Sequence, residues 1–523
     1  MSLPAPECFL AIQLGPNENQ TTLLHECQGL QHNPQCSHKV PPLSWHSKLP
    51  RGGATFVCIA LAIYILFMYL PTISIVFSPC WTVTTCLSTR SSSVIFASTN
   101  LQTDIGSSIK PTLLAADAKL NQLETDGPTD LRHIVFGIAS TASNWESRQD
   151  YVKLWWKPPA GGVPRKGFVW LEGPILPATN VSANTSVLPD VRISGKTNKF
   201  LYTWQGGNPS AIRVSRIISE TFRLGLQDVR WFVLGDDDTI FFPENLAMVL
   251  QKYDHKKFYY LGQSSESHKQ SAKHSFGMAY GGGGIAISYA LAEALEKTQD
   301  DCLTRYPHVY GSDSRIEACA AELGIPLTRE PGFHQIDMHG DIFGLLAAHP
   351  ITPLISLHHV HWIEPIFPDM TRLQALQHLA NAVESDPAGA LQQSICYDTH
   401  QNVTLSVSWG YAVQIFEGVW TPLEVQKPST TFLDWKTGEA DDELFTFDVR
   451  RLPEDACARP AVYFMENVRD AGDGKASIGM YKRRATPTES SCQSFIEHES
   501  VEVLKQRQSD SWVTVRASLS LHV

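Results

Sequence analysis

An apolar run that ends in three consecutive aspartates constrains the fold of this chain more than any other feature. Residues 229–234 are typical of a buried strand, and Asp236, Asp237 and Asp238 follow after one glycine. In an open α/β sheet, ligands bind where the strands end, so the carboxylates are expected at the binding edge. Adjacent carboxylates repel one another unless a cation lies among them, and oxygen ligands select a hard divalent ion such as Mg²⁺ or Mn²⁺. The pattern predicts a metal site for a diphosphate-bearing substrate; the alternative is a solvated acidic turn.

The second constraint is an uncharged apolar segment at residues 54–77. It is long enough for one bilayer crossing, which takes roughly 20 residues. Lys39, Lys48 and Arg51 precede it closely, whereas only Arg90 follows it closely, and this bias predicts a cytosolic N-terminus. We expect a single-span signal anchor with the bulk of the chain in the lumen. The alternative is a buried core helix.

Breaks in composition divide the chain. Residues 1–53 are expected to form a cytosolic tail, 54–77 the transmembrane anchor, and the Ser- and Thr-rich residues 78–127 a lumenal stem. In residues 128–370, strands alternate with helices, which predicts an α/β domain with a mostly parallel sheet and helices on both faces. Residues 371–523 begin with a helix and continue in short aromatic and β-branched runs, so we expect a β-rich C-terminal appendage.

Charge and sequons bear on the partners and the compartment. The net charge of -11 and a pI near 5.9 argue against a nucleic-acid partner, which would require a basic patch. The sequons at Asn180, Asn184 and Asn402 lie on the predicted lumenal side, where glycosylation can reach them. Asn19 has the same pattern but falls in the predicted cytosolic tail, so we expect it to be unmodified.

Cysteines follow the anchor in an odd number, so they cannot all pair within one chain. None shows the close spacing of a zinc site, and a lumenal compartment permits disulfides. Cys302 and Cys319 flank the start of a predicted helix and are expected to pair with each other.

Four glycines, residues 281–284, lie between a predicted strand and a predicted helix. Such a run costs backbone entropy, which a fold tolerates where a ligand must approach the main chain closely. It is not a Walker loop, because no Gly-Lys-Ser or Gly-Lys-Thr follows. The alternative to ligand approach is a tight turn.

Two further groups of residues point to chemistry. Asp313 lies at the start of an amphipathic helix, where spacing alone favours an N-cap role for Ser312 or Asp313. His358, His359 and His361 follow a strand-like run, and such a cluster near a proposed metal site is often functional. In a strand, His359 faces away from the other two, so only one face can supply ligands.

Taken together, these motifs resemble the Fringe-like β1,3-glycosyltransferases of glycosyltransferase family thirty-one, most closely their plant branch. The resemblance runs from roughly residue 133 to residue 368. It rests on matching stretches at residues 133–140, 148–156, 231–238, 277–284, 310–313 and 331–335. It implies a GT-A fold of Rossmann-like type, a type II Golgi membrane protein, a UDP-sugar donor and Mn²⁺ or another divalent cation. The C-terminal extension of the plant branch suits residues 371–523.

Carried onto this sequence, the resemblance makes Asp238 the metal-binding carboxylate, with Asp236 and Asp237 near the ribose and the diphosphate. His359 aligns best with the metal-ligating histidine of the family, and His358, one residue away, stays open as the alternative.

The same resemblance makes Asp313 the catalytic aspartate, which overrides the cap interpretation without excluding a dual role. Gly282 and Gly283 match glycines that line the donor sugar, and Arg148 falls in a motif that binds the nucleotide sugar. One departure is visible at residues 207–210, where Gly-Asn-Pro-Ser stands in place of the His-Arg pair of many plant relatives. It leaves the contacts near that helix start open.

The function implied is an inverting transfer of a sugar from a UDP-sugar to a hydroxyl of a glycan or glycoprotein, forming a β1,3 linkage. A phosphatase with an Asp-x-Asp-x-Thr motif is disfavoured, because Ile240 stands where threonine is required. A catalytically inactive Golgi scaffold or sugar-binding protein is the alternative.

Overall fold

The computed structural model describes residues 127–157, 165–175, 188–439, 441–472, 474–484, 492 and 498–507, together with the short segments 9–14 and 24–26. All of them belong to one compact unit of the chain. The predicted anchor and stem, and the sequons at Asn180 and Asn184, lie outside these residues. Within the described residues, no helix has the length and apolar character needed to cross a membrane.

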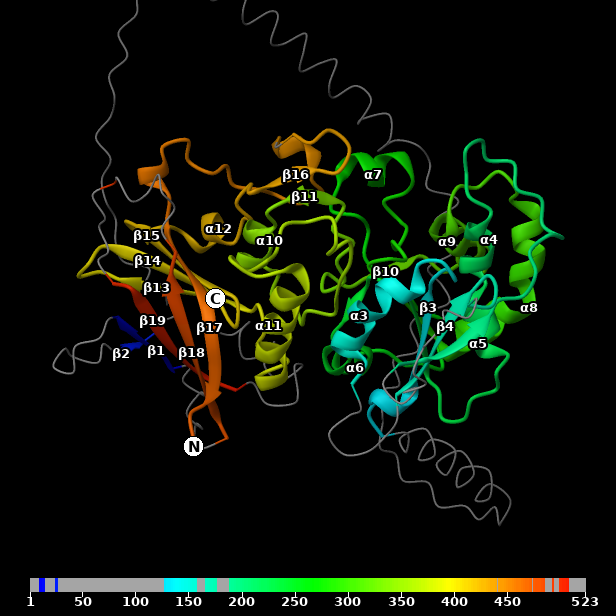
Figure 1. The fold of residues 1–523 in the computed structure, drawn as a ribbon, viewed down its shortest axis with the longest axis horizontal. Helices are drawn as coiled ribbons and strands as arrows, with labels where there is room; N and C mark the ends of the chain where they lie inside the picture. The colour runs from blue at the N-terminus through cyan, green and yellow to red at the C-terminus, as the bar shows by residue number, and fades with distance from the viewer. Residues whose placement is uncertain are drawn as a thin grey trace, which may run out of the picture. The chain divides into compact units, whose positions relative to one another are not determined.

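A seven-stranded mixed sheet forms the first half of this unit (Figure 1). Its strands, in spatial order, are β10 (Leu327–Arg329), β8 (Tyr260–Gly262), β9 (Ile285–Ser288), β6 (Trp231–Asp236), β3 (Ile134–Ala139), β4 (Lys166–Leu171) and β5 (Asp190–Ile193). All neighbours run parallel except β9, which is antiparallel to both β6 and β8. The expected parallel-rich α/β sheet is therefore present, with one reversed strand.

Both faces of this sheet are buried, which explains why its central strands are continuous apolar runs. Along β6, Trp231 and Val233 point into one hydrophobic cluster, while Phe232 and Leu234 point into another. The first face is covered by α3 (Trp145–Trp155) and α6 (Pro243–Leu250). The second is covered by α5 (Ile217–Phe222), α8 (Tyr289–Arg305) and α9 (Ser312–Glu322). Figure 1 shows α3 on one side of β3 and β4, with α5 and α8 on the other.

The apolar spacing after Ser210 predicts one helix that ends at Gly225, but the structure has two short helices in this stretch. α4 (Ser210–Ser215) and α5 meet at Arg216, which lies between them. Arg216 pairs with Asp300 at 2.9 Å and with Glu220 at 2.8 Å, so a buried charged group lies where the helix breaks. As expected, this stretch ends at Gly225, which has a positive φ of 63°.

The second half of the unit contains an eight-stranded antiparallel sheet. In spatial order its strands are β13 (Gln393–Asp398), β14 (Val403–Ser408), β15 (Ala412–Glu417), β17 (Ala461–Asp470), β18 (Ala476–Arg483), β19 (Ser500–Gln506), β1 (Phe9–Leu14) and β2 (Leu24–Glu26). Residues 371–523 are thus β-rich in their described part, as expected. The last two strands come from the range expected to be a cytosolic tail.

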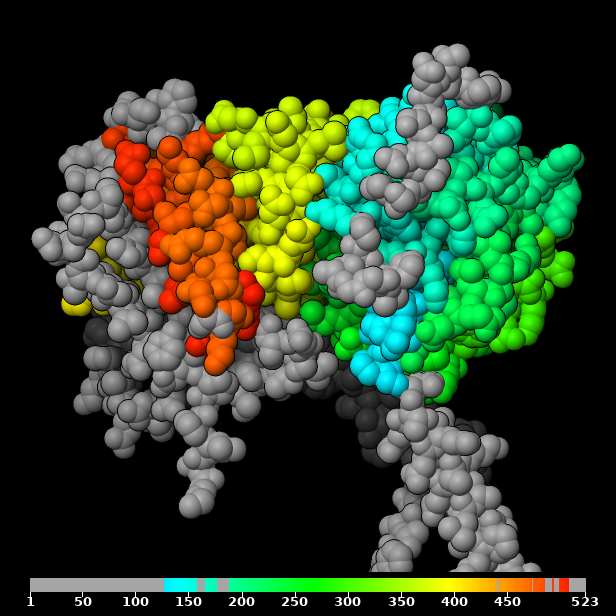
Figure 2. All heavy atoms as spheres, turned by 60° about the horizontal axis from the view of Figure 1, so that its bottom comes forward, coloured from blue at the N-terminus to red at the C-terminus, as the bar shows by residue number. Residues whose placement is uncertain are grey.

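The two sheets share one hydrophobic core. A single buried cluster contains Phe136 and Val233 of the first sheet together with Leu405 and Ile415 of the second. Helix α11 (Arg372–Ser385) packs on both α3 and β17, and in Figure 2 its yellow surface lies between the cyan and orange segments. The C-terminal region is therefore packed into the core rather than appended to it.

Two disulfides lie within the described residues. Cys302 of α8 and Cys319 of α9 are bonded, with their Cα atoms 5.8 Å apart, so the expected pairing is confirmed. Cys457 and Cys492 form the second bond, which the sequence did not predict.

Candidate active site

Three chain segments meet at one edge of the seven-stranded sheet. β6 ends there with Asp236, and Leu234 pairs with Ile285 at the start of antiparallel β9. The reversal of β9 therefore brings residues 281–284 to the same edge as the aspartates. A third segment enters through the short pair of β7 (Ile240–Phe241) and β12 (Ser356–Leu357).

Asp236, Asp238 and His358 form the one group among the described residues whose ligand atoms could hold a metal ion. One atom of each lies within 4.8 Å of the others. The Nε2 atom of His358 lies 3.2 Å from Oδ1 of Asp238 and 3.6 Å from Oδ2 of Asp236. The antiparallel register explains why these side chains meet. Leu357 pairs with Ile240, so His358, which follows Leu357, lies opposite the residues that precede Ile240, and these include Asp238. The predicted cation site thus gains a histidine from a distant segment.

Of the two candidate histidines, His358 lies in the cluster, whereas His359, the better match to the family, lies outside it. Its φ of 53° turns the backbone, and its Nδ1 lies 3.2 Å from Oδ1 of Asp337. His358 instead keeps its Nδ1 3.2 Å from the carbonyl oxygen of Gln335, which can only accept. Nδ1 therefore donates, and Nε2 is left to face the carboxylates as a ligand atom.

Arg148 and His361 hold the second oxygen of Asp238. Nη1 of Arg148 donates to Oδ2 of Asp238 at 3.1 Å, and Nη2 lies 3.1 Å from Nε2 of His361. Because a guanidinium only donates, Nε2 of His361 accepts. The Nδ1 atom of His361 lies 2.7 Å from the same Oδ2, without the angles of a hydrogen bond. Arg148, expected to contact the nucleotide sugar, here orients a carboxylate, and Oδ1 of Asp238 is left for the cluster.

The carboxylates of the cluster favour a positive charge beside them. Burial, together with the nearby Asp238 and Asp313 carboxylates, raises the pKa of Asp236 to about 7, although His358 opposes this. Burial lowers the pKa of His358, but Asp238 and Asp236 outweigh it and raise that pKa to about 9. The pKa of Asp238 lies well below its usual range, because the two histidines outweigh its burial. A positive charge at Nε2 of His358 thus stabilises the carboxylates.

Asp237 points away from this group. Its Oδ2 accepts a hydrogen bond of 2.5 Å from the hydroxyl of Ser140, which follows β3. Burial raises the pKa of Asp237 despite that bond. The triplet therefore splits, with its outer members in the cluster and its middle member tied to the neighbouring strand.

The glycine run lies against the predicted catalytic residues. A Cβ on Gly282 would meet the His358 ring at 2.1 Å, and one on Gly281 would meet Oδ1 of Asp313 at 2.6 Å. The amide of Gly283 donates to Oε1 of Gln335 at 2.7 Å. At Gly281 and Gly282 the backbone is thus packed against side chains of the site, which explains more glycines than a tight turn needs.

Asp313 lies in the first turn of α9, but it does not cap the helix. The N-cap is Gly311, with a φ of 67°, and no side chain makes a capping hydrogen bond there. Oδ1 of Asp313 instead accepts from the Ser312 hydroxyl at 2.9 Å. Burial raises its pKa, while the Gly281 amide lowers it. The cap interpretation is therefore wrong, and the carboxylate faces the glycine run and the acidic cluster.

Asp337 is a further residue of the candidate site. It is 1% exposed and bonds to His359 and to the Ser265 hydroxyl, the latter at 2.6 Å. These partners outweigh its burial and lower its pKa. No strand end or spacing marks it in the sequence.

The C-terminal region also reaches the site. β16 (Phe432–Asp434) pairs with β11 (Met338–Gly340), and the next residue, Trp435, stacks between two histidines. Its ring lies 4.7 Å from His359 at an interplanar angle of 1°, and 4.5 Å from His339 at 13°. A residue far along the chain thus fixes the histidine that holds Asp337.

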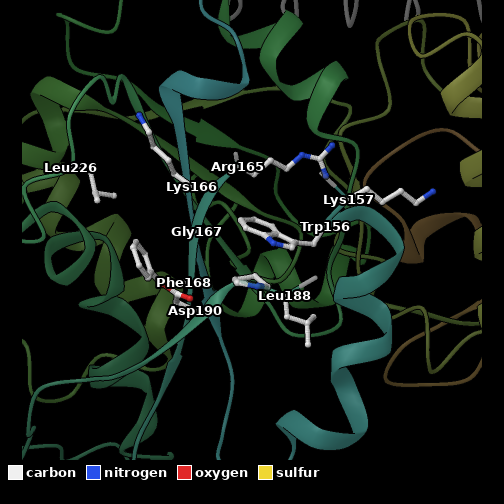
Figure 3. A pocket seen from close by; sticks show the side chains of 10 residues that line it. Trp156, Lys157, Arg165, Lys166, Gly167, Phe168, Leu188, Asp190 and Leu226 are labelled. Atoms are coloured by element: carbon white, nitrogen blue, oxygen red, sulfur yellow. The ribbon is translucent and has the colours of Figure 1, made fainter. Parts of the chain in front are cut away.

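A separate hollow of about 300 Å³ lies at the opposite edge of the sheet, where β4 begins (Figure 3). Lys157, Arg165 and Lys166 line it, which suggests an anion site. However, Nζ of Lys166 donates to the carbonyl of Gln227 at 2.6 Å, and Arg165 and Lys157 pair with glutamates. Arg165 and Lys157 are thus neutralised by carboxylates, and the Lys166 ammonium is held by a backbone carbonyl.

Comparisons with known proteins match parts of the chain. The family described as "Protein of unknown function, DUF604" matches residues 270–519. A β1,3-glucosyltransferase of Mus musculus is 30% identical over 142 residues, which are 26% of this chain and 27% of that protein. Its counterpart in Homo sapiens is 30% identical over 154 residues, 28% of each. The chain thus spans about a quarter of the length of these relatives.

Solved structures of glycosyltransferases match this chain with low TM-scores. The galactosyltransferase LgtC, in complex with donor and acceptor sugar analogues, matches with a TM-score of 0.30 and 13% identity, over 47% of this chain and 94% of that one. Mouse xyloside xylosyltransferase 1 matches with a TM-score of 0.25 and 8% identity, over 38% of this chain and 84% of that one. In sequence, the chain is similar to β1,3-glucosyltransferases over a limited segment.

Proposed function

We propose that this chain is a metal-dependent glycosyltransferase that moves a sugar from a UDP-sugar to a hydroxyl of a glycan or glycoprotein, with inversion at the anomeric carbon. The observation that carries the proposal is the meeting of Asp236, Asp238 and His358 with Asp313 at one sheet edge. A cation site and a separate carboxylate are what such a transfer requires. The limited similarity to β1,3-glucosyltransferases supports it.

Asp236, Asp238 and His358 are the residues that would hold the ion, with Mn²⁺ as the expected metal. Two carboxylates and an imidazole suit a divalent first-row metal. When bound, the ion supplies charge stabilisation to the leaving diphosphate as the sugar–phosphate bond breaks. Arg148 and His361 keep Asp238 oriented, and Gly282 lets the backbone approach the site.

Asp313 is proposed as the general base. Its carboxylate takes the proton of the acceptor hydroxyl, whose oxygen attacks the anomeric carbon from the face opposite the diphosphate. One bond forms, the bond to UDP breaks, and UDP leaves with the bonding electron pair. Since burial raises its pKa, Asp313 is a stronger base than an ordinary aspartate.

The finer assignments are also part of this proposal: a Fringe-like enzyme of the plant branch with a GT-A fold, a β1,3 linkage, and a Golgi protein of type II topology anchored at 54–77. The topology meets one contrary observation. β1 pairs with β19, whereas a single span at 54–77 would place these two strands on opposite sides of a bilayer. The two arrangements exclude each other in one molecule.

Glycosylation mapping separates the two arrangements. In a microsomal translation extract, the anchor predicts modification at Asn402, an exposed residue, and no modification at Asn19. An Asn402→Gln variant controls for that site. Modification at both asparagines would place the two ends on one side and contradict the anchor.

A catalytically inactive scaffold or sugar-binding protein is the second candidate. It would keep the fold and bind UDP-sugars without turnover. Hydrolysis of UDP-sugars in the presence of Mn²⁺ separates an enzyme from such a protein.

The central test is metal-dependent binding of UDP to the full-length chain. Calorimetry with Mn²⁺ and with EDTA is expected to show tight binding only with the ion, because the carboxylates otherwise repel a diphosphate. Asp238→Asn should remove the metal-dependent part of the affinity. The matched control is Asp448→Asn, the same change at a side chain that is 87% exposed. Equal affinity with and without EDTA would refute the metal bridge.

A further inference from the structure

An exposed aromatic group lies beside the proposed base. Trp204 and Tyr310 are 44% and 42% exposed, and their ring centroids are 5.5 Å apart. The other partner of Tyr310 is His274, stacked at 4.7 Å with an interplanar angle of 16°. Three segments distant in sequence thus bring aromatic rings together at the surface.

The loops that carry these rings are fixed in place. The Thr203 amide donates to the carbonyl of Pro307 at 2.8 Å, which ties the Trp204 loop to the Tyr310 loop. Arg315 is 1% exposed and donates to the carbonyls of Tyr306 and Val309 at 2.9 and 2.8 Å.

The same guanidinium lies 4.8 Å from the ring centroid of Tyr202, so one buried arginine holds both loops. The His274 segment is fixed as well, because the Ser275 hydroxyl donates to Glu317 of α9 at 2.6 Å. Such an ordered surface loses little conformational entropy when a ligand binds.

The position of this group relates it to the chemistry. Tyr310 precedes Asp313 by three residues, and Gly311, with a φ of 67°, turns the chain between them. Ser314, next to Asp313, contacts Met278, which continues the His274 segment toward the glycine run. The rings therefore flank the helix start that presents the base.

We propose that Trp204 and Tyr310 form the acceptor subsite, on which a pyranose ring of the acceptor glycan stacks with its reactive hydroxyl toward Asp313. This rests on the proposed function. A pyranose has an apolar C–H face that suits an aromatic ring and a hydroxyl rim that needs polar neighbours. His274, Ser275 and Asp313 supply those neighbours.

Trp435 cannot serve as this platform. Both of its faces are covered, by His359 and His339, so no sugar can stack on it. It fixes the site, whereas Trp204 and Tyr310 are 44% and 42% exposed, so part of each ring is accessible although one face of Tyr310 is stacked on His274. This difference assigns the acceptor to the side of the site that carries the base.

The test uses the full-length chain with Mn²⁺, UDP-glucose, UDP-galactose or UDP-N-acetylglucosamine as donor, and methyl β-galactoside, β-glucoside or β-xyloside as acceptor. Trp204→Ala and Tyr310→Ala are expected to raise the KM for the methyl glycoside about 10-fold relative to the KM for the donor. Tyr310→Phe keeps the ring and should stay within about twofold of wild type. Phe258→Ala, at a ring 41% exposed elsewhere on the surface, is the matched control and should leave both KM values unchanged.

The outcomes separate this proposal from the proposed function. A wild-type protein that hydrolyses UDP-sugars but transfers to no methyl glycoside overturns the pyranose subsite and leaves the transferase in place. Alanine variants with an unchanged acceptor KM overturn it as well. Absence of UDP-sugar hydrolysis by wild type overturns the proposed function and the subsite together.

Discussion

The two sheets of this chain are built from similar apolar strands, yet only one of them gathers chemistry. In the seven-stranded sheet most neighbours are parallel, so the carboxyl ends of β3 and β6 meet at one edge. In the eight-stranded sheet every pairing is antiparallel, so strand ends alternate between the two edges. The comparison teaches that strand direction, rather than strand composition, places the polar residues together.

The two regions nevertheless depend on one another. They share a buried cluster, and β16 of the second half pairs with β11 of the first. The candidate catalytic residues thus lie at one sheet, whereas the buried residues that stabilise the fold come from both sheets. Substitutions in each region are expected to separate these properties.

The largest effect is expected at Asp313. Asp313→Asn keeps the shape of the side chain but removes the base, so turnover should fall about 10² to 10⁴-fold. Since Gly311 is the N-cap, helix stability should not change. Measurements of kcat, of UDP binding with Mn²⁺ and of circular dichroism check the prediction.

The pH profile sharpens the same assignment. Burial raises the pKa of Asp313, so kcat/KM of the wild type should fall with acid at a higher pH than an ordinary carboxyl, near 4, would allow. Near-normal turnover of Asp313→Asn with an intact fold would return the search for the base to Asp337.

The second effect is on stability in the antiparallel sheet. Leu405 is 5% exposed in the shared core, and Leu405→Ala should lower the free energy of unfolding by about 2–5 kcal/mol. Because the core is continuous, urea unfolding should be one transition that shifts as a whole, and kcat below the transition should be unchanged. Two separate transitions would mean that the sheets are independent units.

The smallest effect is expected where the regions meet. Trp435→Ala removes two stacked contacts, each worth about 0.5–1.5 kcal/mol, and frees the His359 ring that holds Asp337. We expect the KM for the UDP-sugar to rise about 10-fold. Trp435→Phe should recover most of the loss.

The control for Trp435 is Trp420→Ala. Trp420 lies in the same half of the chain, and its ring contacts Phe416, 5.3 Å away, and Arg450 rather than a histidine of the site. It should leave the donor KM unchanged. An equal effect of both substitutions would mean that the C-terminal half acts on the site only through general stability.

The sequence predicted the segments that make up the candidate site because its signals are local. A buried strand followed by Asp236, a glycine run, and Asp313 at a helix start each occupy a few consecutive residues. The Cys302–Cys319 bond was predicted for the same reason, because both residues flank one helix start. The structure confirms this bond. The α/β alternation likewise follows from the period of the apolar residues.

Only the tertiary structure decided which residues meet across long separations. The antiparallel pairing of Leu357 with Ile240 brings His358, rather than His359, to the aspartates. The row of histidines in the sequence does not show how this strand is aligned with its partner. The pairing of β16 with β11 brings Trp435 to His359, although no local motif marks it. The sequence by itself determined the strand, the carboxylates and the glycines, because backbone propensity and apolar period act over a few residues. The ligand histidine, the partner of Asp337 and the shared core depend on contacts between distant segments, which form only when the whole chain packs.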